Sequence, residues 1–209
     1  MPSGAENEGD VWGLISDVHG NYAALVEALR VLQSAGVRKL AFLGDYLGRG
    51  ESDRCVDCIR RVADLAIVGN RDLDWQDRVS AASRAWVLGL PRLASTGRLL
   101  ISHGDARLTP RLSTGQIGRD FVRAWPALVE YDARVWAFGH SHHARVWRKT
   151  SAAELAQPLA GQIVRMQADG RYCVNVGSAG LPFPGKGGAS VAVVDFARGE
   201  IRHIMLDRV

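Results

Sequence analysis

The chain has little cysteine and no long apolar run. Three cysteines stand in 209 residues, and a small, odd number does not build the disulfide framework of a secreted protein. The first ten residues are polar and acidic and lack the basic and apolar regions of a signal peptide. No apolar stretch reaches the length that a membrane-spanning helix needs. These absences favour a cytoplasmic location and argue against a membrane partner.

An excess of one charge is also missing. Lys and Arg outnumber Asp and Glu by 26 to 22, the two signs are mixed along the chain, and no basic run predicts specific nucleic-acid binding. Cys55 and Cys58 have C-x-x-C spacing, but no second pair completes a zinc site. We therefore interpret both as buried small residues, with a redox or zinc role as the less favoured alternative.

The chain does have enough apolar material for one core. Hydrophobic residues make up 47% of the sequence, and a chain of this length buries one substantial core. We predict a single domain, residues 1–209. The first two thirds alternate between strand and helix, whereas the last third favours short antiparallel strands. We interpret residues 151–162 as a mobile excursion.

The hydrophobic patterns predict the following elements. The early strands are Val11 to Ser16, Lys39 to Leu43, Leu65 to Val68, Leu99 to Ile101 and Val135 to Phe138. The helices are Asn21 to Ala35, Ser52 to Val62, Ser80 to Leu88 and Ile117 to Ala124. The later strands are Ala144 to Arg148, Ile163 to Met166, Tyr172 to Val176, Ser190 to Asp195 and Ile201 to Leu206. Gly36 is expected to end the first helix, and Ser52 to cap the second.

Each of the five early strands stops at a Gly or Ser, and a potential metal ligand follows directly. A small residue lets the backbone turn tightly there, and neighbouring strands that end together bring their ligands to one sheet edge. The candidate ligands that follow these strands directly are Asp17, Asp45, Asn70, His103 and His140. Two further candidates, His19 and His142, lie two residues after Asp17 and His140. A single Asp, Asn or His at a strand end is usually a turn or packing residue. Here, however, five of the six histidines of the chain lie at or near these strand ends, which favours a metal site.

Seven ligands are too many for one tetrahedral ion. They suit two divalent ions that share a bridging carboxylate, with water in the open positions. A mixture of imidazole and carboxylate without thiolate suits Mn, Fe, Zn or Ni better than Cu(I) or an iron–sulfur cluster. We favour two manganese ions as cofactors, with Fe, Zn, Ni or Mg as alternatives.

These motifs resemble the calcineurin-like metallophosphoesterase superfamily. The resemblance is carried by Ser16-Asp17-Val18-His19-Gly20-Asn21, Gly44-Asp45, Gly69-Asn70, His103-Gly104 and Gly139-His140-Ser141-His142. The later stretch from Asn175 to Pro182 resembles its small bacterial and archaeal phosphodiesterase branch. The family implies an α/β fold, a four-layer αββα sandwich of two mixed β-sheets flanked by helices.

The resemblance also implies roles for individual residues. It makes Asp45 the bridge, places His19, Asp17 and His142 with it on one ion, and places Asn70, His103 and His140 with it on the other. A hydroxide held between the ions would act as the nucleophile. Asn70 would also contact the substrate.

One position departs from the family pattern. Many relatives have a histidine after the Gly-Asn pair, as the proton donor to the leaving oxygen, and this chain has Arg71. Arginine stays protonated at working pH, so it cannot be a general acid, but it can grip a phosphate oxygen or stabilise a leaving alkoxide. We assign Arg71 a catalytic and substrate-binding role, with a solvent-facing side chain as the alternative. Arg49 is a second candidate for phosphate binding and Arg107 a weaker one, and Trp75, close after Arg71, is a candidate for the wall of a nucleobase pocket.

The sequence therefore predicts a metal-dependent phosphoesterase that cleaves phosphodiester or phosphoanhydride bonds in a phosphorylated small molecule or nucleotide. Symmetric dinucleotide polyphosphate hydrolysis and protein Ser/Thr phosphatase activity are the alternatives within the enzyme class. A non-catalytic metal-binding scaffold is the alternative outside it. The oligomeric state is left open.

Overall fold

The computed structural model describes residues 11–104, 125–151, 157–159, 163–183 and 188–207. Two six-stranded mixed sheets pack face to face. The first sheet has the order β3-β2-β1-β11-β12-β9. Its strands are β1 (Val11–Ile15), β2 (Lys39–Phe42), β3 (Leu65–Ala66), β9 (Ile163–Arg165), β11 (Ser190–Asp195) and β12 (Glu200–Met205). β1, β2 and β3 are parallel, and β11, β12 and β9 continue the sheet antiparallel.

The second sheet has the order β4-β5-β6-β10-β7-β8. Its strands are β4 (Leu93–Ser95), β5 (Leu99–Ser102), β6 (Val135–Phe138), β7 (Arg145–Lys149), β8 (Gln157–Leu159) and β10 (Arg171–Asn175). β5, β6 and β10 run parallel, and the outer strands pair antiparallel. In each sheet the parallel strands therefore end at a common edge.

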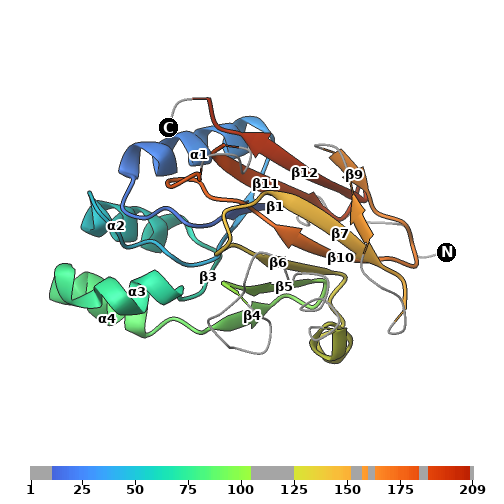
Figure 1. Ribbon diagram of the computed structural model, residues 1–209, viewed down its shortest axis with the longest axis horizontal. Coiled ribbons are helices and arrows are strands. Elements are labelled where there is room, and N and C mark those ends of the chain that lie inside the picture. Colours follow the sequence, from blue (N-terminus) through green and yellow to red (C-terminus); the bar gives the residue numbers. More distant parts are fainter. Residues whose placement is uncertain (1–10, 105–124, 152–156, 160–162, 184–187, 208–209) are drawn as a thin grey trace.

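The helices cover the outer faces of the sheets. They are α1 (Tyr22–Ser34), α2 (Ser52–Val62), α3 (Asn70–Trp75) and α4 (Ala81–Leu88), with a short 3-10 turn at Gln76–Arg78, and residues 125–130 are also helical. Figure 1 shows α1 to α4 gathered at one end of the molecule, where β1, β2 and β3 lead into them. No helix in the described part of the chain is long and apolar enough to span a bilayer.

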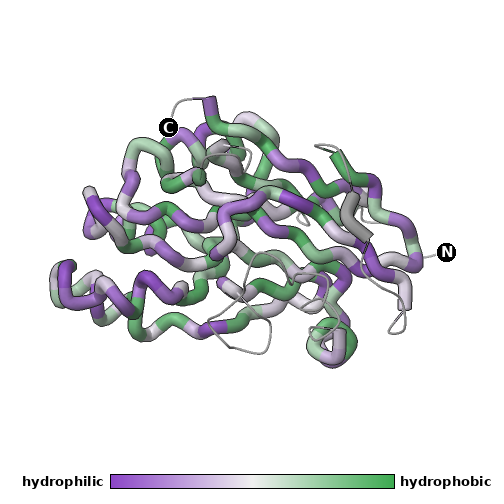
Figure 2. The backbone as a smooth tube through the Cα atoms, in the orientation of Figure 1, coloured by the Kyte–Doolittle hydropathy of each residue, from purple (hydrophilic) through white to green (hydrophobic). Residues whose placement is uncertain are grey.

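Three hydrophobic clusters hold these layers together. The first, which includes Leu14, Leu43, Ile101 and Val174, joins the inner faces of the two sheets. A second packs α1, α2 and α4 on the first sheet, and a third packs the helix at residues 125–130 on the second. In Figure 2 the green of hydrophobic residues runs along the central strands. Each fully buried large apolar side chain contributes about 1.5–3 kcal/mol, and the layers form the predicted αββα sandwich.

Most predicted elements have the expected bounds within a residue or two. Asn21 caps α1 by accepting a hydrogen bond from the Ala24 N–H, and Gly36 follows the helix with a φ of +78°. The prediction that Ser52 caps α2 is wrong. Glu51 holds that position, and the Ser52 hydroxyl instead bonds to the Gly48 backbone.

The sequence did not predict α3, β4 or β8. β8 lies inside the segment 151–162, which was expected to be an excursion. The predicted strand from Leu65 to Val68 is shorter, because only Leu65–Ala66 pairs with β2. The predicted helix from Ile117 to Ala124 lies outside the described residues.

Candidate metal centre

All seven candidate ligands lie at the strand ends that face one another across the two sheets. The first sheet supplies Asp17 and His19 after β1, Asp45 after β2 and Asn70 after β3. The second supplies His103 after β5, and His140 and His142 after β6. The ligands come from both sheets, so the site forms only where the sheets pack together.

Asp17, His19 and His142 form a first cluster. The Asp17 Oδ1 atom lies 2.9 Å from His142 Nε2 and 3.6 Å from His19 Nε2. The two imidazole Nε2 atoms are 3.3 Å apart. Ligand atoms bound about 2.0–2.2 Å from one ion lie roughly 3–3.5 Å from each other, so this spacing fits three ligands of a single ion.

Asp45, Asn70, His103 and His140 form a second cluster. The Asn70 Oδ1 atom lies 3.1 Å from His103 Nε2 and 2.8 Å from His140 Nδ1. The Asp45 Oδ2 atom lies 3.2 Å from His103 Nε2 and also 3.8 Å from His19 Nε2 in the first cluster. Asp45 is therefore the carboxylate that stands between the two clusters.

Hydrogen bonds on the far side of each ring orient the imidazoles. The Nδ1 atom of His103 lies 2.7 Å from the Leu43 carbonyl, and that of His142 lies 2.6 Å from the Leu181 carbonyl. A ring that donates its Nδ1 proton to a carbonyl presents a bare Nε2 lone pair on the other side. The Nε2 atom of His142 faces a carboxylate oxygen of Asp17, and that of His103 faces one of Asp45.

The two oxygens of the Asp17 carboxylate have different surroundings: one is held by hydrogen bonds, and the other faces the candidate metal site. Its Oδ2 atom accepts from the Ser16 hydroxyl (2.6 Å) and the His140 backbone N–H (2.9 Å). Its Oδ1 atom is also buried and is left facing the imidazole nitrogens of His142 and His19. Acceptor atoms that converge without a donor between them fit a cation, so the residues present fit divalent metal ions.

The charges of these groups are strongly coupled. Burial acts to raise the pKa of Asp17, but hydrogen bonds with His142 and His19 hold it well below the usual range. Burial acts to lower the pKa of His103, but the Asp45 carboxylate outweighs it and raises the pKa to about 10. In the metal-free protein these carboxylates favour protons on His103 and His142, and bound cations would replace those protons.

The backbone is strained at the ligands themselves. Asp17, His19, Asp45, His140 and His142 all have φ between +51° and +64°, a region that non-glycine residues rarely adopt. Such strain persists only where surrounding structure fixes it, and it clusters at functional sites. The D-x-H spacing alone predicts that Asp17 and His19 share one side of an extended segment. This prediction is wrong, because a left-handed turn brings the two residues together.

Steric contacts explain why glycine precedes the candidate ligands Asn70 and His140. A Cβ atom on Gly139 would lie 1.8 Å from the Ser16 hydroxyl and 2.3 Å from Asp17 Oδ2. A Cβ on Gly69 would lie 2.2 Å from Asp45 Oδ1. Gly44, before Asp45, has a φ of +89°, which favours glycine for its backbone conformation. Gly69 and Gly139 do not have a positive φ, so their backbone conformation does not require glycine. Gly69 and Gly139 therefore make room for a neighbouring carboxylate.

Asp72 is a residue whose role the sequence analysis missed. Its carboxylate is fully buried and accepts four backbone N–H groups, from Asp45, Tyr46, Leu47 and Gly69, at 2.7–3.0 Å. It thereby ties the turn after β2 to the turn after β3, which carry two of the ligands. Burial and the nearby Asp45 charge raise its pKa to about 6. Its place after Gly69-Asn70-Arg71 was visible in the sequence, but its partners, up to 27 positions away, were not.

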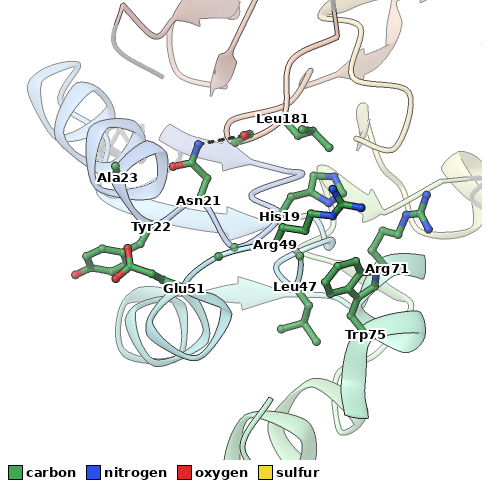
Figure 3. A pocket seen from close by; sticks show the side chains of 14 residues that line it. His19, Asn21, Tyr22, Ala23, Leu47, Arg49, Glu51, Arg71, Trp75 and Leu181 are labelled. Atoms are coloured by element: carbon green, nitrogen blue, oxygen red, sulfur yellow. Dashed lines mark hydrogen bonds between the residues drawn. The ribbon is translucent and has the colours of Figure 1, made fainter. Parts of the chain in front are cut away.

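The arginine candidates lie outside the ligand clusters. The backbone N–H of Arg71 donates to Asp45 Oδ1 (2.7 Å), but its half-exposed guanidinium pairs with Asp74 at 3.4 Å. Arg49 is exposed. Figure 3 shows both side chains near His19, along the wall of a cavity of about 600 Å³. Arg107 lies outside the described residues.

The cysteines and the remaining histidine of the last strand lie elsewhere. Cys55 and Cys58 carry free thiols on α2, and burial raises the pKa of Cys55 to about 12. His203 on β12 bonds to the Asn175 carbonyl at 2.8 Å. Neither arrangement brings these groups to the metal centre.

Comparisons with known proteins agree with this architecture. An uncharacterized protein of Methanocaldococcus jannaschii is 27% identical over 201 residues, which cover 87% of this chain and 81% of that protein. The crystal structure of a metallophosphoesterase from Sphaerobacter thermophilus matches with a TM-score of 0.77 and 26% identity, over 92% of this chain and 87% of that one. An archaeal phosphodiesterase shares the fold, with a TM-score of 0.55 and 15% identity over 94% of this chain and 99% of that one.

The family model for the calcineurin-like phosphoesterase superfamily domain matches residues 11–199. This range includes every candidate ligand and all strands of the two sheets except β12. The chain therefore belongs to the calcineurin-like phosphoesterase superfamily.

Proposed function

We propose that this protein is a dinuclear metal-dependent phosphoesterase that hydrolyses phosphodiester or phosphoanhydride bonds. One observation carries the proposal: the Asp45 Oδ2 atom lies within 3.2 Å of His103 in one cluster and 3.8 Å of His19 in the other. A carboxylate in that position supports two ions side by side, which is the arrangement used for in-line displacement at phosphorus.

Seven residues would hold the two ions. One ion takes Asp17, His19, Asp45 and His142, and the other takes Asp45, Asn70, His103 and His140. When bound, the ions supply Lewis-acid chemistry, which polarises phosphoryl oxygens and lowers the pKa of water. Nitrogen and oxygen ligands without thiolate favour manganese, with Fe, Zn, Ni or Mg as alternatives.

The remaining residues bind and orient the substrate. The Arg71 guanidinium lies on the cavity wall beside His19, where it can hold a phosphoryl oxygen. It cannot donate a proton to a leaving oxygen, so substrates with good leaving groups are favoured. Arg49 can grip a second phosphate oxygen, and Asn70 binds through an uncharged amide oxygen. The substrate in this proposal is a phosphorylated small molecule or nucleotide, met in the cytoplasm.

The cavity favours a small substrate over a protein. Its volume of about 600 Å³ lies within the range of small-molecule sites. Symmetric dinucleotide polyphosphate hydrolysis is thus the nearer alternative, and protein Ser/Thr phosphatase activity the more distant one. A metal-binding scaffold would keep the ions but show no turnover.

Asp45→Asn tests the proposal, with Asp57→Asn as the control because Asp57 lies on the exposed face of α2. Metal analysis and hydrolysis of bis(4-nitrophenyl) phosphate and a diadenosine polyphosphate would be measured with Mn²⁺. We expect two ions per wild-type chain, and a loss of about 10⁴-fold in turnover in Asp45→Asn, the scale seen when a member of a catalytic unit is removed. Asp57→Asn should match the wild type.

Two results would contradict the proposal. A wild-type protein that binds two ions but hydrolyses none of the phosphodiesters or phosphoanhydrides would be a scaffold. An Asp45→Asn variant that keeps both ions and full turnover would remove the bridging role.

A further inference from the structure

The cavity beside the metal centre extends well beyond the candidate ligands. It is lined by the loop after β1 and the start of α1, by the loop after β2, by α3, and by the loop that holds Leu181. His19 is the one candidate ligand among its lining residues. A substrate phosphate at the ions would therefore leave most of this space for another part of the same molecule.

Gly48 and Gly180, which line the cavity, lie where its loops pack closely against backbone. A Cβ on Gly48 would lie 2.2 Å from the His19 carbonyl oxygen, and one on Gly180 would lie 1.9 Å from the Val18 carbonyl oxygen. Side chains cannot be accommodated at either position without moving the backbone. The two glycines therefore let the loops that line the cavity pack closely against one another.

Trp75 supplies an aromatic wall. Its side chain lies in the cavity lining together with Leu47, and Figure 3 shows the indole beside Leu47 and Arg71. The Arg78 guanidinium lies over the indole, 4.3 Å from the ring centroid, which helps to hold the ring in place. Aromatic side chains in such positions bind planar rings by stacking.

Two cations lie between this wall and the metal centre. Arg49 and Arg71 both line the cavity, and Figure 3 shows their guanidinium groups near His19. Arg49 makes no hydrogen bond or ion pair with another residue in the described ranges, whereas Arg71 has one contact with Asp74 at 3.4 Å. Arginine is well suited to phosphate oxygens, so the cavity offers a cationic part and an aromatic part in series.

We propose that this cavity is a subsite for the nucleoside part of a nucleotide substrate. The base stacks on Trp75, and the phosphate group that carries it lies against Arg49 and Arg71. This inference rests on the proposed function, because it places the scissile phosphate at the candidate metal centre. A free phosphate or a simple alkyl phosphate would leave the aromatic wall unused.

Calorimetric titration of the Mn²⁺-loaded protein tests the subsite without depending on turnover. The probes are adenosine 5′-monophosphate, ribose 5-phosphate and phenyl phosphate, and the variants are Trp75→Leu, Trp75→Phe and Arg49→Gln. Stacking of one base on an aromatic side chain gives about tenfold or more in affinity. Wild type should therefore bind adenosine 5′-monophosphate about tenfold more tightly than ribose 5-phosphate.

The variants separate stacking from charge. Trp75→Leu should remove the preference for the adenine ring and leave the affinity for ribose 5-phosphate unchanged, and Trp75→Phe should keep most of the preference. Arg49→Gln should weaken all three probes by a similar factor. Phenyl phosphate that binds as tightly as the nucleotide would assign the subsite to simple aryl groups and overturn the nucleoside assignment.

Equal affinity of the wild type for adenosine 5′-monophosphate and ribose 5-phosphate would overturn the inference. This comparison decides it even if Trp75→Leu does not fold. Hydrolysis of phosphodiesters with no ring preference would leave the proposed function standing and remove the subsite. Ring-dependent binding without hydrolysis would keep the subsite and remove the proposed reaction.

Discussion

The two sheets contribute different chemistry to the same site. The first sheet supplies both carboxylates, the amide and one imidazole, and the second supplies the other three imidazoles. The bracing also crosses between them: His103 of the second sheet bonds to the Leu43 carbonyl of the first, and Asp17 accepts the backbone N–H of His140. Each half of the candidate centre is held in place by the other, so sheet packing and ligand geometry depend on each other.

The largest effect should come from removing imidazoles of the second sheet. If both histidines bind the same ion, as proposed, His103→Ala and His140→Ala should each lose that ion and about 10⁴-fold in turnover. The double variant should be no worse than either single one, since the ion is already lost. Metal analysis and kcat would be measured for all three, with His203→Gln as a control on a histidine outside the site. A double variant far worse than the singles, each of which retains two ions, would contradict the shared ion.

The next largest effect concerns Arg71, on the helix α3 that follows β3 of the first sheet. Without a general acid, log kcat/KM should fall steeply as the leaving-group pKa rises. Arg71→His should restore a donor with a suitable pKa and raise the rate on poor leaving groups by about 100-fold, the low end of general-acid catalysis. Arg71→Ala should raise KM. Identical slopes and KM values in all three proteins would show that the guanidinium takes no part.

Asp72 tests how the first sheet holds its ligands. Asp72→Asn replaces one acceptor oxygen with an amide N–H₂ that faces two backbone N–H donors. Metal affinity should fall by about 10–100-fold, the usual effect of removing a group that orients a ligand. The control is Asp77→Asn, on the exposed turn after α3. Melting temperatures with and without metal separate the effects: unchanged metal affinity in a less stable protein would make Asp72 purely structural.

The smallest effect is a pH dependence from the pair that joins the two sheets. The pKa of His103 is raised from its usual 6.5 to about 10 beside Asp45. The stability from that proton is fully present below about pH 6.5 and is lost as pH rises through about 10. The metal-free Tm should therefore fall as the pH rises from about 6.5 to about 10.

Manganese should flatten that dependence, because the ion replaces the proton. Thermal unfolding in EDTA and in Mn²⁺ would be followed from pH 6 to pH 10, with His103→Gln as the control that lacks the titrating group. A flat metal-free curve in the wild type would show that His103 does not hold a proton against Asp45.

The sequence predicted most of the elements because strand periodicity and caps are local signals, whereas the sandwich was implied by the resemblance to the superfamily. Asn21, for example, caps α1 through a partner three residues away. It did not predict α3, because Asn70–Trp75 is short and largely polar. It also did not predict β8, because this strand has only three residues and forms by antiparallel pairing with β7. Such short elements depend on tertiary contacts that local propensity does not encode.

The candidate ligands were visible because each follows an apolar run. What the sequence could not show is how they are held. The left-handed turns at Asp17 and Asp45, and the four N–H groups that converge on Asp72, depend on loops that meet only in the folded chain. Their assignment as metal ligands stays a prediction until metal is measured.

The most direct test of the account is whether two ions share Asp45. Electron paramagnetic resonance of the protein titrated with Mn²⁺ would be recorded for the wild type and for Asp45→Asn. We predict an exchange-coupled dinuclear signal in the wild type at two equivalents of Mn²⁺, and only the signal of isolated ions in the variant. An isolated-ion signal in the fully loaded, active wild type would contradict the shared carboxylate.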